Sequence, residues 1–261
     1  MPMAICSENR LVGISYPGQP GKATAFFYDG LGRRTAITST PAGGGSAVAI
    51  SYIWCGLRPC QARNAANATT REYYGEGEFT PGSPSQAYYY GPDQIGSVRR
   101  VFASTSNAPA YSYDPYGNAL QTTAPLTDFG YAGMFINIES GLHLTLFREY
   151  DSVSGRWLSR DPFGETSDPV GNLYVYAAED PISNTDPMGL FAHPNDPSPC
   201  GAGPQTPDHT PVDPPVWRKC VMIVCMALGL NNPFAPPSEP TIDDATTQQI
   251  VIPDDKKRKG K

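Results

Sequence analysis

Carboxylate side chains are the groups of this chain whose types and spacing could do chemistry. Two carboxylates held near one water can divide the work of hydrolysis, because their charges keep one of them protonated. The ionised acid takes a proton from the water and the protonated acid polarises the carbonyl, which is worth roughly 10²–10⁴ in rate. The candidate acids between residues 155 and 190 are Asp161, Asp168, Glu179, Asp180 and Asp186.

These aspartates also have a purely structural interpretation. Asp before Pro commonly starts a turn, in which its side chain accepts hydrogen bonds from backbone N–H groups. The chain contains seven Asp-Pro pairs. Spacing alone therefore does not separate a catalytic aspartate from a turn aspartate.

Histidine gives a weaker signal than the carboxylates. Leu142, Leu144 and Leu146 alternate with His143 and Thr145. This period of two predicts a half-buried strand with His143 on its polar side, as an ordinary surface residue. The other two histidines lie in a proline-rich stretch with no fixed spacing to a partner, so we assign no catalytic role to histidine.

Cysteine does not indicate a metal site. Six cysteines are spread over the 261 residues, too sparsely for a disulfide scaffold and in no spacing typical of zinc. Cys55 and Cys60 leave four residues between them, as do Cys220 and Cys225, but no histidine pair accompanies them. We expect buried or free thiols, with no metal and no other cofactor.

The elements that must position the acids are short strands joined by turns. Gly (26) and Pro (28) are abundant and Tyr (15) exceeds Phe (10), which favours many turns between aromatic strands. Residues 23–38 predict a hairpin around an Asp29-Gly30 turn. A second apolar strand is expected at 47–54, and strand, turn and strand recur over 88–117. We expect an all-β fold of stacked hairpins, because only a neighbour can cover each apolar face.

Composition changes after Leu190. Residues 191–261 are proline-rich without a regular pattern, which predicts a mostly irregular tail with at most one short packed element at 217–230. The apolar run 220–230 is far shorter than the roughly 20 residues of a membrane helix, so we expect no membrane span. The formal charge of −6 provides no broad positive field, so we expect no nucleic-acid binding by the core.

Three pieces of sequence around the acids, in this order and close together, carry a family resemblance. They are Gly-Arg-Trp-Leu-Ser-Arg-Asp-Pro-Phe-Gly (155–164), Asn-Leu-Tyr-Val-Tyr (172–176) and Asp-Pro-Met-Gly-Leu (186–190). They resemble the end of the core region of the rearrangement hot spot (Rhs) or YD-repeat family. Tyr-Asp-Gly-Leu-Gly-Arg-Arg (28–34) resembles one YD repeat, and Tyr-Asp-Pro-Tyr-Gly (113–117) resembles another element of that family.

The resemblance implies a fold and a domain organisation. Residues 1–190 are expected to form an Rhs repeat-associated core, a partial YD-repeat shell of stacked β-hairpins. Residues 191–261 are expected to be a variable C-terminal extension, at the position where the family carries its effector or toxin. The proposed boundary is Leu190.

For function, the resemblance implies an aspartyl-type self-cleaving protease formed by residues 155–190 at the end of the shell. The implied cut is the Leu190–Phe191 bond, which makes the chain's own C-terminal segment the substrate. Pro187 and Gly189 are expected to shape the backbone before the cut, with Gly189 as a position that tolerates positive φ close to the site.

The resemblance also ranks the acids. Asp161 is the leading catalytic candidate, because the Arg160-Asp161-Pro162 element matches the family motif. Arg160 is assigned an orienting or charge-balancing role, which requires a bend at Pro162 or a different carboxylate, since neighbouring side chains in a strand point to opposite faces. The second acid is either Asp186 or Asp168. The family often places an acid directly before Asn-Leu-Tyr, whereas Asp168 lies four residues ahead of that Asn.

Two other interpretations fit the same residues. Tyrosine-rich strands can form a non-enzymatic shell, structural or carbohydrate-binding, although Tyr in hairpins more often packs across strands. The chain can also be a truncated, inactive remnant, because about one clear YD unit is visible in it. In the family interpretation, a cognate immunity protein and a secretion machinery are the expected partners. The first residues do not resemble a signal peptide, so we expect a protein that is cytoplasmic before export and reaches the exterior or the cell surface by another route.

Overall fold

The computed structural model of this chain describes residues 1–103, 109–121, 124–162, 171–190 and 193–194. Antiparallel strands and turns make up this part of the chain, so the prediction of an all-β fold is confirmed. No helix in the described ranges is long and apolar enough to cross a membrane. The predicted tail element at 217–230 lies outside the described residues.

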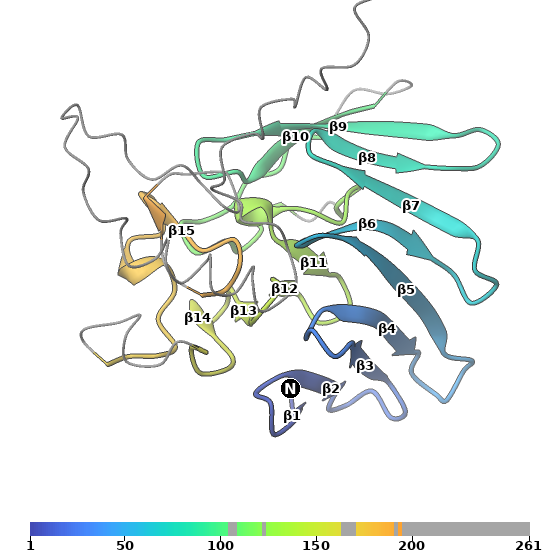
Figure 1. Ribbon diagram of the computed structural model, residues 1–261, viewed down its shortest axis with the longest axis horizontal. Coiled ribbons are helices and arrows are strands. Elements are labelled where there is room, and N and C mark those ends of the chain that lie inside the picture. The colour runs from blue at the N-terminus through green and yellow to red at the C-terminus, as the bar shows by residue number, and fades with distance from the viewer. Residues whose placement is uncertain (104–108, 122–123, 163–170, 191–192, 195–261) are drawn as a thin grey trace, which may run out of the picture.

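A ten-stranded sheet is the largest element, and each of its strands pairs with the next one along the chain. In Figure 1 this sheet curves from β10 to β1. The predicted hairpin at 23–38 is β3 and β4, and the predicted strand at 47–54 is β5. The strands are β1 (Met3–Ile5), β2 (Leu11–Ser15), β3 (Ala23–Tyr28), β4 (Arg34–Thr40), β5 (Val48–Cys55), β6 (Arg58–Arg63), β7 (Thr69–Tyr74), β8 (Gly77–Thr80), β9 (Gln86–Pro92) and β10 (Val98–Ala103).

Two smaller sheets follow along the chain. A four-stranded antiparallel sheet lies on the concave side of the large one (Figure 1). A two-stranded sheet comes after it, and single-turn 3₁₀ helices precede each small sheet. These elements are η1 (Tyr131–Gly133), β11 (Phe135–Asn137), β12 (Leu142–Leu144), β13 (Glu149–Asp151), β14 (Arg156–Trp157), η3 (Ala177–Glu179), β15 (Asn184–Thr185) and β16 (His193–Pro194).

The hydrophobic core lies between the large sheet and the four-stranded sheet. Leu11, Phe26 and Ile37 of the large sheet pack in one cluster with Leu142 and Leu144 of β12. Behind the four-stranded sheet, a second cluster gathers large aromatic side chains. Its aromatic members are Tyr131, Tyr150, Trp157 and Tyr176. The small sheet is therefore covered on both faces.

This double cover corrects the prediction for His143, which is only 2% exposed. Its ring centroid lies 5.7 Å from that of Tyr131 and 6.0 Å from that of Tyr150. The alternation along β12 is real, but its second face packs against the aromatic cluster instead of water. Burial lowers the pKa of His143 to about 4.

A five-residue turn recurs along the chain. The N–H of its first residue donates to the carbonyl of the fifth, the N–H of the fourth donates to the carbonyl of the first, and the fourth residue has a positive φ. Where the first residue is Asp or Asn, its Oδ1 also accepts the N–H groups of the third and fifth residues. About one YD unit is visible in the sequence, whereas the described part of the chain contains its turn six times. The turns begin at Cys6, Asp29, Asn64, Asp93, Asp114 and Gly130.

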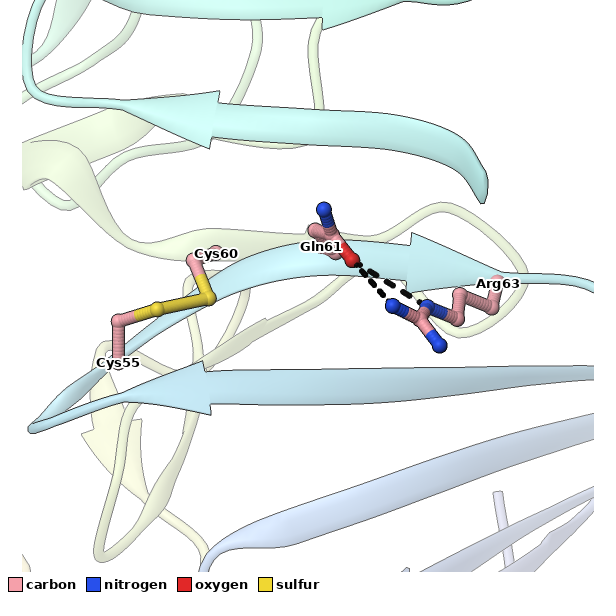
Figure 2. Close-up of a disulfide and its surroundings, with 4 residues drawn as sticks. All are labelled: Cys55, Cys60, Gln61 and Arg63. Atoms are coloured by element: carbon pink, nitrogen blue, oxygen red, sulfur yellow. Dashed lines mark hydrogen bonds between the residues drawn. A yellow bond between two sulfur atoms is a disulfide. The ribbon is translucent and has the colours of Figure 1, made fainter. Parts of the chain in front are cut away.

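The expectation of thiols is wrong for Cys55 and Cys60, which form a disulfide with Cα atoms 5.6 Å apart. Figure 2 shows it joining β5 and β6 close to the end of their hairpin. The two cysteines face each other because a tight turn brings the strands together. Cys6 is the free cysteine of the described residues.

Candidate functional site

The Asp-Pro-Met-Gly-Leu sequence folds into a variant of the recurring turn. Gly189 has φ +75°, and Oδ1 of Asp186 accepts the N–H groups of Gly189 and Leu190 at 2.8 Å each. In the turn that begins at Asp114, Oδ2 of the aspartate binds the side-chain amide of Asn118 at 2.7 Å. The corresponding fifth residue here is Leu190, which has no polar side chain. Oδ2 of Asp186 contacts an arginine instead.

That arginine is Arg148, which contacts the carboxylates of two aspartates. Its Nη2 lies 3.0 Å from Oδ2 of Asp161 and 2.9 Å from Oδ2 of Asp186. Its Nε donates to the carbonyl of Gly189 at 2.6 Å, and its Nη1 to the carbonyl of Leu173 at 3.4 Å. Because both carboxylate oxygens contact one nitrogen, they lie within about 6 Å of each other, where like charges repel strongly.

All three charged side chains are removed from water. Arg148 is 2% exposed, Asp161 7% and Asp186 2%. A buried charge costs several kcal/mol unless it is paired and hydrogen-bonded, so the three groups depend on one another. The guanidinium carbon of Arg148 also lies 4.4 Å from the ring centroid of Trp157, which adds a cation–π contact in this dry setting.

The turn between β12 and β13 positions Arg148. The Thr145 hydroxyl donates to the carbonyl of Arg148 at 2.7 Å and accepts its N–H at 3.1 Å. Asp161 is placed from the other side, because its N–H donates to the carbonyl of Leu173 at 3.0 Å. Residues far apart in the sequence thus meet through backbone hydrogen bonds.

The segment before the proposed cut is held by its backbone and by its side chains. The N–H of Phe147 donates to the carbonyl of Met188 at 3.1 Å. Leu190 is 1% exposed and shares an apolar cluster with Met188 and Leu146. Trp54 of β5 and Leu57 of the turn between β5 and β6 also pack against this cluster. A cavity of about 440 Å³ extends from this cluster along the inner face of the large sheet.

Two short strands flank the proposed cut. β15 pairs with β16 in antiparallel register, Asn184 opposite Pro194 and Thr185 opposite His193. The Leu190–Phe191 bond therefore lies in the connection between two paired strands. Phe191 itself, and the boundary predicted at that point, lie outside the described residues.

Of the acids predicted from sequence, the structure brings Asp161 and Asp186 together, and Asp168 lies outside the described residues. Arg160 is exposed, and its backbone carbonyl accepts the side-chain amide of Asn9 at 2.7 Å. The arginine between the two acids is Arg148, which sequence reasoning missed. The sequence signal for Arg148 is a single cation next to a run of apolar residues. If that run is buried, the arginine is buried with it and needs an acid partner.

Curated relatives resemble most of this chain but are far longer. The tRNA nuclease WapA of Bacillus subtilis is 28% identical over 70% of this chain and 8% of its own length. The double-stranded DNA deaminase toxin A of Burkholderia cenocepacia is 27% identical over 70% of this chain and 15% of its own length. Teneurin-1 of mouse (Mus musculus) is 28% identical over 58% of this chain and 6% of its own length. The chain thus spans a small part of each of these proteins.

Solved structures share the fold. A crystal structure of TcdB2-TccC3-TEV aligns with a TM-score of 0.55 at 24% identity, over 72% of this chain and 10% of the other. The Tc holotoxin pore of Photorhabdus luminescens, with a mutated TccC3, aligns with a TM-score of 0.55 at 21% identity, over 73% and 10%. Residues 14–182 match the family described as the Teneurin YD-shell. Together with the repeated turns and the curved sheet, this match shows that the chain belongs to the YD-shell family, which includes the Rhs toxins.

Proposed function

We propose that this chain is the C-terminal part of an Rhs polymorphic toxin, whose core cuts its own polypeptide after Leu190 and releases residues 191–261. The observation that carries the proposal is the convergence of Asp161 and Asp186 on Arg148. The same guanidinium binds the carbonyl of Gly189, one residue before the proposed bond. Two buried acids and the segment to be cut therefore share one cation.

The reaction needs one base and one acid. Asp161, ionised, takes a proton from a water whose oxygen attacks the carbonyl carbon of Leu190. The second acid, protonated because two close carboxylates do not both ionise cheaply, donates its proton toward the carbonyl oxygen. When the C–N bond breaks, the nitrogen of Phe191 leaves as an amine with a proton from the site, and Leu190 keeps the new carboxyl group.

Asp186 and Asp168 remain the two candidates for the second acid. Asp186 is supported by its contact with the same nitrogen of Arg148. Its Oδ1 also accepts two N–H groups of the substrate turn, so Asp186 fixes the position of Leu190 whether or not it transfers a proton. Substitution by Asn keeps an oxygen acceptor for the turn and removes the proton exchange.

The test compares Asp161→Asn, Asp186→Asn and Asp168→Asn in the full chain, with the rate of cleavage after synthesis as the readout. Asp161→Asn is expected to abolish cleavage, because it removes the base. The second acid is the aspartate, Asp186 or Asp168, whose replacement by Asn also abolishes cleavage in a chain that circular dichroism shows to be folded. Cleavage of Asp161→Asn at the wild-type rate would refute the proposal.

Delivery and partners follow from the same proposal. The chain's own tail is the substrate, and a cognate immunity protein would neutralise the released tail in the producing cell. The relatives named tRNA nuclease and double-stranded DNA deaminase toxin support a toxic cargo. Export through a secretion machinery would bring the protein to the exterior or the cell surface.

One observation favours carbohydrate binding as a second function. Tyr74, Tyr89 and Phe102 are more than half exposed on β7, β9 and β10. Tyr89 pairs with Phe102 across the strands, and Gly77 pairs with both tyrosines, so the three rings line one path over the sheet. Aromatic faces of this kind can stack on sugar rings. Glycan-array binding that Tyr89→Ala weakens, in a chain that does not cut itself, would favour this function over proteolysis.

A further inference from the structure

The β5–β6 hairpin lies beside the segment that precedes the proposed cut. Trp54 and Leu57 pack against the apolar cluster that contains Met188 and Leu190. Both line the 440 Å³ cavity together with Met188. The Trp54 indole donates to a backbone carbonyl of β4 at 2.7 Å, which fixes the ring on the inner face of the large sheet.

The same segment is held from its other side by backbone hydrogen bonds. Phe147 donates to the carbonyl of Met188, and Arg148 donates to the carbonyl of Gly189. These contacts recognise any backbone and carry no preference for a side chain. The side chains of residues 188 and 190 lie in the apolar cluster, against which two residues of the hairpin pack.

The disulfide supports the hairpin where its ladder is weak. Trp54 pairs with Pro59, which has no N–H to donate, and the strand register shifts between Ile53 and Trp54. The Cys55–Cys60 bond joins the strands at this point (Figure 2). It therefore restrains the backbone that carries Trp54 and Leu57.

We propose that Trp54 and Leu57 are specificity-determining residues of the self-cleavage, which seat Met188 and Leu190, and that the Cys55–Cys60 disulfide holds them in place. The inference rests on the proposed function and adds its selectivity and its dependence on redox state. Cleavage is then fast when the disulfide is formed and slow when it is reduced, since a small misplacement of a reacting segment costs a large factor in rate.

The redox step is an exchange with a thiol reductant of the glutathione class. Cys55 is exposed, so a thiolate can reach the bond. Two reductant thiols transfer two electrons and two protons: the S–S bond breaks, Cys55 and Cys60 become thiols, and the two reductant sulfurs join in a disulfide. A reducing cytosol therefore slows the cut, and an oxidising compartment favours it.

The first experiment follows loss of the 28.1-kDa chain during cell-free synthesis in oxidised glutathione or in dithiothreitol. The wild type is expected to cut about tenfold faster under oxidising conditions. The double variant Cys55→Ser/Cys60→Ser is expected to cut slowly in both. The matched control is Cys6→Ser, which removes a cysteine outside the disulfide and should behave as the wild type. Equal wild-type rates in the two buffers would overturn the redox dependence.

The second experiment tests selectivity by enlarging the side chain of residue 188 and shortening that of residue 57, which packs against the same cluster. Met188→Phe is expected to slow cleavage by overfilling the cluster, and Leu57→Ala to restore the rate of Met188→Phe while slowing the wild-type sequence. If the role of Leu57 were merely structural, Leu57→Ala would slow cleavage of both the wild-type sequence and Met188→Phe. Trp54→Ala, which opens space in the same cluster, is expected to slow the wild-type sequence and to restore part of the rate of Met188→Phe. The matched control is Ile53→Ala, because Ile53 belongs to the same hairpin but is 42% exposed.

The outcomes separate this inference from the function on which it rests. If Asp161→Asn cuts like the wild type, or if the wild type is uncut in both buffers, the proposed function fails and the inference fails with it. If cleavage requires Asp161 but is unchanged by Trp54→Ala, and Leu57→Ala gives no rescue of Met188→Phe, the inference alone is overturned.

Discussion

Arg148 and Asp186 form an ion pair inside the protein, with Nη2 2.9 Å from Oδ2. The other carboxylate oxygen of Asp186 accepts the N–H groups of its own turn. One aspartate thus serves as turn starter and as charge partner at the same time. The turn and the ion pair are compatible, because each uses a different oxygen of Asp186.

Removing Arg148 is expected to destabilise the fold strongly. Arg148→Met leaves two buried carboxylates without their common cation, which should lower the free energy of unfolding by about 3–5 kcal/mol. Urea denaturation followed by circular dichroism measures the loss. The matched control is Arg160→Met, an exposed arginine of the same region, with an expected change of about 0.5 kcal/mol or less. Equal effects of the two substitutions would contradict the assignment of the buried cation.

Replacement of Gly189 by Ala is expected to destabilise the protein more than the same replacement of another glycine with the same φ. A Cβ at Gly189 would collide with the Thr145 hydroxyl and the backbone of Arg148. Gly44 has the same φ of +75° and open space around its missing Cβ. Gly44→Ala therefore measures the cost of the left-handed backbone alone, about 1 kcal/mol. Thermal unfolding should show a larger loss for Gly189→Ala, and similar losses would refute the close approach.

Glu149 should make stability fall as the pH rises. The side chain is 3% exposed beside the Tyr28 hydroxyl, and burial raises its pKa from 4.5 to about 7, against the attraction of Arg34. A raised folded-state pKa gives stability that is complete below pH 4.5 and is lost as the pH rises through about 7. Glu149→Gln should match the wild type at pH 4.5 and exceed it above pH 7, by up to about 3 kcal/mol. A stability difference between the two proteins that stays the same across this pH range would contradict the burial of Glu149.

His143 should make the stability of the protein fall as the pH falls. Its folded-state pKa of about 4 lies below the ordinary 6.5, so its contribution to stability is complete above pH 6.5 and is lost as the pH falls toward 4. Replacement by Gln removes the titration and should flatten this part of the stability curve. NMR titration of the His143 ring checks the cause directly: a midpoint near 6.5 would place the ring in water.

Sequence reasoning was most successful where local chemistry decides the structure. Asp-Gly turns and aromatic strands predicted β3 and β4 at nearly their observed bounds, since both signals act within a few residues. The turn at Cys6 was not foreseen, because its first residue lacks a carboxylate and its backbone alone repeats the pattern. The turns at Cys6 and Asn64 have Asn9 and Asn67 at the position where the other copies have Gly.

Contacts between distant segments were not predictable in the same way. The burial of His143 depends on aromatic rings contributed by η1 and β13, which a period of two does not reveal. The site shows the same limit. Asp161 and Asp186 were named from their motifs, but their common partner Arg148 comes from a third segment. Only the folded chain shows that one cation joins these pieces.

The position of the cut tests the central claim most directly. Mass spectrometry of the freshly synthesised full chain should find two products, the smaller one beginning at Phe191. The same preparation of Asp161→Asn should contain only the intact 28.1-kDa chain. A folded wild-type chain that stays intact, or a cut at Phe191 that persists in Asp161→Asn, would contradict the account.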